Sequence, residues 1–214
     1  MPEGNHLRVL LLGDPALGGA AQKRAQAAFP ALDTIIWRRG DRAGRDAARQ
    51  FLLGNRWDLA LSVYSDLVLQ PEELARIAVP LNIHPALPAL RGRGYDRLPL
   101  IEGHLRYGAT LHWMTEAVDA GPIVRVLSRT LPPRLTHHEL RRRTQALSLR
   151  LLDHTLAALR GCGKAAELRA QLQRIAARPG SGRACWSGRY VSEAELQRLL
   201  RHLERQAPGH PALH

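Results

Sequence analysis

Short apolar runs alternate with stretches of helical length through the first half of the chain, and this alternation restricts the fold more than any other feature. The apolar runs cover residues 7–12, 34–37, 59–63 and 79–83. A strand joined to the next by a helical crossover is typical of parallel strands, and continuously apolar strands indicate a sheet covered on both faces. We therefore predict an α/β, Rossmann-like, doubly wound and mostly parallel sheet flanked by helices.

The helical stretches between these runs carry recognisable start and stop signals. We expect a helix over residues 16–29, a second helix that the Arg-rich segment 38–49 leads into and that ends near residues 54–55, and a third over residues 71–78, where proline opens the first turn. Residues 85–108 are rich in Pro, Gly and Arg, and we expect them to form one long functional loop. Two further strands are predicted at residues 109–114 and 123–127.

The sequence predicts mostly helices in the last third of the chain. Thr136 and Glu139 form a capping box that opens a long helix, and Ser192 and Glu195 give the same signal for a terminal helix. We expect residues 178–189 to form a loop carrying Trp186 and the tail from Gln206 to fray. These signals predict a catalytic domain over residues 1–160 and a short helical C-terminal extension with a tail, residues 161–214, packed on it.

The charge of the chain suggests a polyanionic partner, but its composition weakens that interpretation. The formal net charge is +12, which would favour nucleic acid or an anionic membrane through counterion release. All but Lys23 and Lys164 of the 31 basic residues are arginine, in a chain rich in Ala, Leu and Gly, a skew typical of coding bias. We therefore expect nucleic acid not to be the partner, and keep a basic nucleic-acid-binding protein on a catalytically idle fold as the alternative of another class.

Other compositional signals exclude several classes of protein. No uninterrupted apolar run approaches the length of a membrane-spanning helix, so we expect no membrane association. Two cysteines, Cys162 and Cys185, make no disulfide framework, which favours a cytoplasmic location. Ten histidines occur without a metal-binding spacing, so no metal is expected.

Polar residues at the ends of apolar runs indicate the chemistry. Asn82 and His84 are two apart on a strand, so their side chains leave the same face near the carboxyl end, where open α/β sheets bind ligands. Asp119 follows in a turn that could fold back over the same edge. An amide, an imidazole and a carboxylate suit acyl transfer: the amide and imidazole can donate to an oxyanion, and the carboxylate can orient the imidazole and raise its pKa.

The spacing of these residues resembles a known family. The elements Asn82-x-His84-Pro85-x-x-x-Pro88, Gly92, Gly108-x-Thr110-x-His112 and Asp119-x-Gly121-x-Ile123 resemble the signature of the folate-dependent formyltransferases. That family includes glycinamide ribonucleotide transformylase, methionyl-tRNA formyltransferase and the amino-sugar N-formyltransferases, and the detailed match runs over residues 58–127. The resemblance implies that 10-formyltetrahydrofolate donates its formyl group directly to a primary amine, with Asn82 and His84 stabilising the oxyanion and Asp119 aiding proton transfer. His112 belongs to the pattern, but its role, structural or catalytic, stays open.

The resemblance also implies where the donor binds. The pterin would lie against the backbone of two segments, Asp66, Leu67, Val68 and Leu69 in the first and Thr115, Glu116, Ala117 and Val118 in the second.

The acceptor is less determined. Arg91, Arg93 and Arg97 follow the catalytic strand and could grip phosphate or carboxylate of an acceptor. Asp14 in the loop after the first strand would repel a phosphate there. The resemblance implies that members acting on transfer RNA carry an additional C-terminal RNA-docking domain, which we do not expect here. We therefore expect a small-molecule amine, with a nucleotide-linked amino sugar as the first candidate and phosphorylation of the acceptor left open. A 10-formyltetrahydrofolate hydrolase is the alternative enzyme, and a homodimer is also left open.

Overall fold

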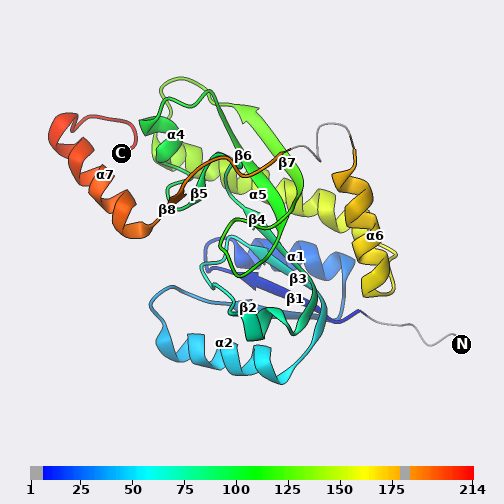
Figure 1. The fold of residues 1–214 in the computed structure, drawn as a ribbon. Helices are drawn as coiled ribbons and strands as arrows, with labels where there is room; N and C mark the ends of the chain where they lie inside the picture. Colours follow the sequence, from blue (N-terminus) through cyan, green and yellow to red (C-terminus); the bar gives the residue numbers. More distant parts are fainter. Residues whose placement is uncertain (1–6, 179–183) are drawn as a thin grey trace, which may run out of the picture.

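A six-stranded mixed sheet forms the centre of the protein in a computed structural model that describes residues 7–178 and 184–214. The strand order is β2-β1-β3-β4-β6-β7. The first four run parallel, whereas β6 is antiparallel to both β4 and β7. The predicted α/β, Rossmann-like fold is confirmed (Figure 1). The strands are β1 (Val9–Gly13), β2 (Leu32–Ile36), β3 (Trp57–Val63), β4 (Ile77–His84), β6 (Arg106–Trp113) and β7 (Ile123–Thr130).

Helices cover both faces of this sheet, as continuously apolar strands require. Alternate side chains of β1 and β3 point to opposite faces: Leu11 and Leu61 enter one core with α1, α5 and α6, and Leu10 and Ala60 enter a second core with α2. The helices are α1 (Gly18–Ala28), α2 (Arg42–Gly54), α3 (Pro71–Leu74), α4 (Leu98–Ile101), α5 (His137–Leu159), α6 (Ala165–Ala176) and α7 (Glu193–Gln206).

The predicted caps of α5 and α7 form in different ways. Thr136 accepts a hydrogen bond from the backbone N–H of Glu139, and the Glu139 carboxylate accepts from the Thr136 N–H at 2.9 Å, which completes the capping box. At α7, Ser192 accepts from the backbone N–H of Glu195 at 3.2 Å, but the Glu195 carboxylate pairs with Arg189 instead. The start of each helix is therefore predicted correctly, and only the second box remains half formed.

Three expectations about the connections are wrong. The segment 85–108 is not one loop, because it contains β5 (Arg91–Gly92), α4 and the first residues of β6. The third helix ends at Leu74 rather than near residue 78, because β4 already begins at Ile77. The tail does not fray: Ala212 is fully buried, and its carbonyl accepts a hydrogen bond from Arg97.

The C-terminal extension makes contacts at two places that are far apart in Figure 1. Leu168, Leu172 and Ile175 of α6, a helix that the sequence patterns did not single out, enter the same core as the sheet. Strand β8 (Tyr190–Val191) pairs in parallel with β5. The division at residue 160 stays a prediction.

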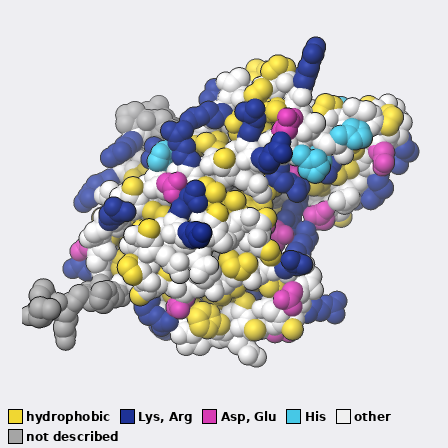
Figure 2. Space-filling model, turned by 180° about the vertical axis from the view of Figure 1, so that it is seen from behind, with side chains coloured by type: hydrophobic (Ala, Val, Ile, Leu, Met, Phe, Trp, Pro, Cys, Tyr) yellow, Lys and Arg dark blue, Asp and Glu magenta, His cyan; other side chains and the backbone are white. Residues whose placement is uncertain are grey.

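The distribution of basic side chains on the surface helps to interpret the excess of arginine. On the face shown in Figure 2, Lys and Arg side chains are spread among apolar and acidic ones instead of forming one continuous block. In the part of the chain that the structure describes, no helix has the length and apolarity needed to cross a membrane.

Candidate active site

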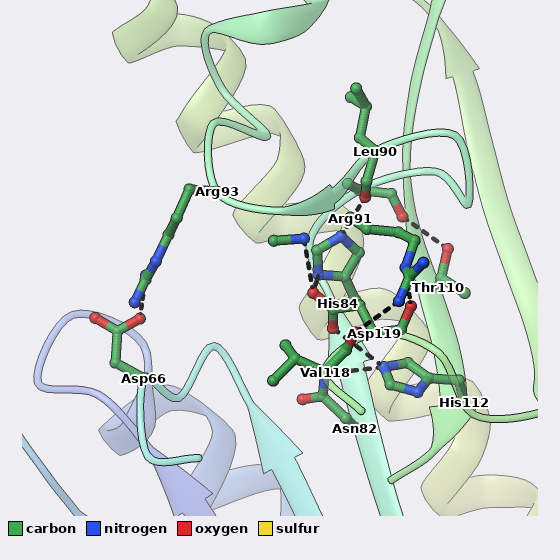
Figure 3. Close-up of polar contacts among 12 residues, drawn as sticks. Asp66, Asn82, His84, Leu90, Arg91, Arg93, Thr110, His112, Val118 and Asp119 are labelled. Atoms are coloured by element: carbon green, nitrogen blue, oxygen red, sulfur yellow. Dashed lines mark hydrogen bonds and ion pairs between the residues drawn. The ribbon is translucent and has the colours of Figure 1, made fainter. Parts of the chain in front are cut away.

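The three predicted catalytic residues come together at the end of β4 (Figure 3). Asn82 and His84 lie on β4, and β6 runs antiparallel beside them and ends at Trp113, opposite Leu81. The turn after β6 therefore begins next to this polar edge and returns over it. Asp119 in that turn lies with Oδ2 3.3 Å from Nδ1 of His84, and both side chains are buried.

His112 is the fourth member of the cluster. It pairs with Asn82 across the β4–β6 ladder, and its Nε2 lies 3.0 Å from Asn82 Nδ2 and 3.5 Å from Asp119 Oδ1. The sequence left its role open, because the family pattern includes it without saying what it contacts. The cross-strand register could have indicated the contact, since it places these two side chains on one face.

Hydrogen-bond partners assign the protons of both imidazoles. His84 Nε2 lies 2.7 Å from the Leu90 carbonyl oxygen and must donate to it, so Nδ1 faces the Asp119 carboxylate. His112 Nδ1 donates to the Trp113 carbonyl at 2.8 Å, which leaves Nε2 to accept from the Asn82 amide. An amide group has two N–H donors, so the second N–H of Asn82 can serve a ligand.

The pKa values reflect a dry site. Burial lowers the pKa of His84 below its ordinary value, although Asp119 and the Leu90 carbonyl act in the opposite direction. The carboxylate acts on this pKa in the predicted upward direction, but desolvation is the larger effect and makes the net shift downward. Burial alone would raise the pKa of Asp119, but His84, His112 and the Gly92 N–H together hold it below the usual range.

The loop around β5 holds Asp119 in place. The Arg91 guanidinium donates to the Asp119 carbonyl at 2.8 Å and to the Val118 carbonyl at 3.2 Å, and the Gly92 N–H donates to Asp119 Oδ2 at 3.0 Å. Asp119 has a φ of 48° and Gly92 a φ of 82°, so both lie in the left-handed region. Arg91 does not line the adjacent cavity. The geometry thus differs from the predicted substrate contact, and Arg91 positions the turn that carries Asp119.

A cavity of about 540 Å³ opens beside the cluster and reaches most of the predicted binding residues. Asn82, His84, His112 and Asp119 contribute to its wall, as do Arg93 and Arg97. Of the two segments predicted to hold the pterin, the members that line the cavity are Asp66, Leu67, Val68, Leu69, Thr115, Ala117 and Val118. Glu116 does not line it.

The arginines of the cavity have partners in this structure. Arg93 pairs with Asp66 (Figure 3) and lies 3.8 Å from Glu193. Arg141 pairs with Asp96 at 2.7 Å, and Arg97 donates to the tail carbonyl described above. An anionic ligand would therefore compete with existing contacts.

The loop after β1 is also occupied by the protein's own groups. Oδ1 of Asp14 accepts hydrogen bonds from the N–H groups of Ala16 at 3.1 Å and Leu17 at 2.8 Å. Burial raises the pKa of Asp14, with Asp66 contributing in the same direction. The Asp14 carboxylate thus occupies the N–H donors that precede α1. These donors are not free for a phosphate, in agreement with the expectation that Asp14 disfavours phosphate at this loop. Over residues 7–178 and 184–214, no group of three His, Cys, Asp or Glu side chains is arranged to hold a metal ion.

These features are those of a candidate acyl-transfer site on a Rossmann-like sheet, and comparison with known families agrees. The formyl transferase family matches residues 10–156, more than half of the chain. The chain belongs to the formyl transferase family. The predicted resemblance and the prediction of a formyltransferase enzyme are confirmed.

Solved structures of this family share the fold at low sequence identity. A likely sugar N-formyltransferase from Mycobacterium tuberculosis has a TM-score of 0.66 at 19% identity, with 90% of this chain and 78% of that chain covered. An N-formyltransferase from Helicobacter canadensis, solved with folinic acid and dTDP-3-aminofucose, has a TM-score of 0.64 at 12% identity, covering 88% and 72%. Glycinamide ribonucleotide transformylase 1 from Symbiobacterium toebii has a TM-score of 0.54 at 24% identity, covering 73% and 89%.

Proposed function

We propose that this protein transfers the formyl group of 10-formyltetrahydrofolate to a primary amine of a small molecule, and that the acceptor is a nucleotide-linked amino sugar. The observation that carries the proposal is the cluster of Asn82 with the buried His84 and Asp119 beside a cavity of about 540 Å³, in a chain of the formyl transferase family.

The cluster can perform the transfer without a covalent nucleophile. The acceptor nitrogen attacks the formyl carbon, and the carbonyl electrons move to oxygen to give an oxyanion. The free N–H of Asn82 donates to that oxyanion, and the Asp119–His84 pair takes the proton that the new C–N bond makes acidic. When the intermediate collapses, the bond from carbon to the folate nitrogen breaks and that nitrogen receives a proton, giving a formamide and tetrahydrofolate.

The hydrogen bond from His84 to Leu90 limits how His84 can stabilise the oxyanion. Because Nε2 already donates to the Leu90 carbonyl, His84 donates to the oxyanion only by sharing or exchanging that bond. Asn82 is therefore the more direct oxyanion donor, and His84 acts chiefly in proton transfer with Asp119.

The cavity wall supports a folate in the predicted position. Residues 66–69 follow β3, and Thr115, Ala117 and Val118 precede Asp119, so both segments border the catalytic cluster. The Thr115 hydroxyl donates to the Ala117 carbonyl at 3.0 Å and steadies the second segment. We propose that the pterin binds between these segments through backbone groups. The Helicobacter canadensis structure contains folinic acid, which supports a folate ligand.

The contacts near the cavity favour an amino sugar as the acceptor over a ribonucleotide whose phosphate would bind at the β1 loop. Asp14 occupies the donors of that loop, as shown above. Arg93 and Asp66 are each about one-third exposed, so their ion pair is weak and can be exchanged for an anionic group of the acceptor. We propose that Arg93 and Arg97 contact a nucleotide-linked acceptor. The Helicobacter canadensis N-formyltransferase was solved with a nucleotide-linked amino sugar, dTDP-3-aminofucose, which supports this class.

The test is a turnover screen that measures tetrahydrofolate release. The protein is mixed with 10-formyltetrahydrofolate and one amine at a time: nucleotide-linked amino sugars, free amino sugars, amino acids or glycinamide ribonucleotide. One equivalent of tetrahydrofolate per formylated amine, absent from a His84→Gln variant, supports the proposal. No turnover with any amine contradicts it.

The two alternatives give different results in the same screen. Formate and tetrahydrofolate released without an amine, and abolished in Asp119→Asn, would establish the hydrolase. RNA affinity that depends on salt and survives His84→Ala, without turnover, would establish the nucleic-acid-binding protein.

A further inference from the structure

A segment near the C-terminus is bound along the loop that holds the candidate catalytic residues. This segment, residues 184–192, lies beyond the 10–156 stretch that matches the family. The N–H of Ser187 donates to the Pro88 carbonyl at 3.2 Å, and the Arg93 N–H donates to the Val191 carbonyl at 2.8 Å. Between these bonds β8 pairs with β5, as the orange strand beside β5 in Figure 1 shows. The segment is thus attached along the whole loop from residue 88 to residue 93.

That loop delivers three contacts to the catalytic cluster. Its Leu90 carbonyl accepts from His84, its Arg91 side chain donates to the carbonyls of the Asp119 turn, and its Gly92 N–H donates to the Asp119 carboxylate. A displacement of the loop would therefore move the imidazole and the carboxylate relative to each other.

Trp186 in the same segment contacts the cluster directly. Its ring lies edge-on to His112, with centroids 5.0 Å apart at 88°, and to His84, with centroids 5.9 Å apart at 65°. Its indole N–H donates to the Gly121 carbonyl at 2.7 Å, at the end of the turn that carries Asp119. Trp186 is not among the described residues that line the cavity, so it covers the histidines on a side away from the ligand.

We propose that Trp186 is a positioning residue for the His84–Asp119 pair. The indole packs against both imidazoles, excludes water from them and ties down the turn that holds the carboxylate, without touching the substrate. The effect of Trp186 on the rate of formyl transfer rests on the proposed function, whereas its effect on the two imidazoles rests on geometry alone.

Few charged and titratable groups face these imidazoles in the part of the chain that the structure describes. His84 faces Asp119 and His112, and His112 faces Asp119 and the Asn82 amide. Trp186 adds no charge of its own. Its removal therefore changes the hydration and geometry of the pair and leaves its charged neighbours in place.

The first experiment measures the imidazoles and needs no substrate. Histidine ring resonances are titrated by NMR in wild type, Trp186→Ala and Trp186→Phe, with His84 assigned from the spectrum of His84→Gln. Trp37→Ala and Trp37→Phe are matched controls, because Trp37 also donates its indole N–H to a backbone carbonyl, that of Asp41, at 2.8 Å. We expect the pKa of His84 to rise toward its ordinary value in Trp186→Ala and to stay near the wild-type value in Trp186→Phe and both controls. A wild-type titration of His84 in Trp186→Ala overturns the proposal.

The second experiment measures catalysis on the acceptor found in the screen. Trp186→Ala is expected to lower kcat by about 10-fold or more while the KM for the donor changes by less than about 2-fold, because a misplaced catalytic pair slows chemistry more than binding. Trp186→Phe should restore most of kcat, and the acid limb of the rate profile should move to higher pH in Trp186→Ala. A raised KM with unchanged kcat would make Trp186 a binding residue and overturn the positioning role. If wild type turns over no amine, the proposed function fails while the titration still decides the role of Trp186.

A second substitution tests the segment without altering Trp186. A Cβ added at Gly188 would lie 1.6 Å from the Ala89 carbonyl oxygen, so Gly188→Ala must push the segment away from the loop. Gly209→Ala is the matched control, since a Cβ there meets nothing within 4 Å. We expect Gly188→Ala to lower kcat and raise the pKa of His84 as Trp186→Ala does. Wild-type kcat and titration in a folded Gly188→Ala would contradict the role of the segment, and if this variant does not fold, the Trp186 variants decide.

Discussion

Replacing Asp119 by asparagine removes a negative charge that contacts the imidazoles of both His84 and His112. Its Oδ2 lies 3.3 Å from His84 Nδ1, and the two side chains are 7% and 5% exposed. An imidazolium formed at that distance would be attracted by about 5 kcal/mol at an effective dielectric constant of about 20. The amide dipole and relaxation recover part of this attraction, and loss of acid–base assistance costs about 100-fold at the least. We therefore expect Asp119→Asn to slow formyl transfer by between about 100-fold and about 5,000-fold, which corresponds to about 2.7 to 5 kcal/mol.

The assay is a single turnover with enzyme in excess over 10-formyltetrahydrofolate and saturating amine, stopped by rapid quench. It isolates the chemical step, so donor binding and product release do not hide the effect. Glu102→Gln is the matched control, because Glu102 also pairs with a histidine, His104, at 2.9 Å, but on the surface. The control should react at the wild-type rate. A folded Asp119→Asn variant that reacts within about threefold of wild type would refute the proton-transfer role.

Three further outcomes follow from the same structure. The pKa values of His84 and His137 lie below the ordinary 6.5, so the unfolded state binds more protons than the folded state once the pH falls to that value. The melting temperature should therefore fall as the pH is lowered from about 7.5 to about 5, and a constant value would contradict the burial of these neutral rings. Leu151→Ala should lower the free energy of unfolding by about 2–5 kcal/mol in urea titrations, because Leu151 is fully buried in the larger core. Arg91→Lys should lower kcat more than it changes the KM for the acceptor, since Arg91 holds the carbonyls of the Asp119 turn; a defect confined to KM would restore the predicted substrate contact.

The elements of the fold could be predicted because their signals are local. Apolar runs marked β1 to β4, and the Thr136–Glu139 box marked the start of α5. The buried tail was missed because its partners are distant in the sequence: Arg97, 115 residues away, donates to the Ala212 carbonyl, and the His137 N–H donates to the Pro211 carbonyl. A residue's local pattern carries no information about a partner at that distance.

The candidate catalytic cluster was predictable for a different reason. The family pattern includes Asn82, His84 and Asp119 at fixed spacings. Because the fold determines these spacings, the residues could be named before their contacts were known. The direction of the His84 pKa shift could not be predicted, because it depends on how completely the ring is buried. Arg91 was assigned to the substrate because its sequence position beside the site did not reveal which way its guanidinium points.

By itself, the sequence determined the class of fold, the family and the identity of the three candidate catalytic residues. These properties depend on periodicity and on ordered spacings along the chain. Tertiary structure alone decided that β6 brings His112 to Asn82, that Arg91 supports the Asp119 turn, and that Trp186 covers both imidazoles. The Trp186 contact with Gly121 joins residues 65 apart in the chain, and such a contact exists only after the sheet and the C-terminal extension have packed together.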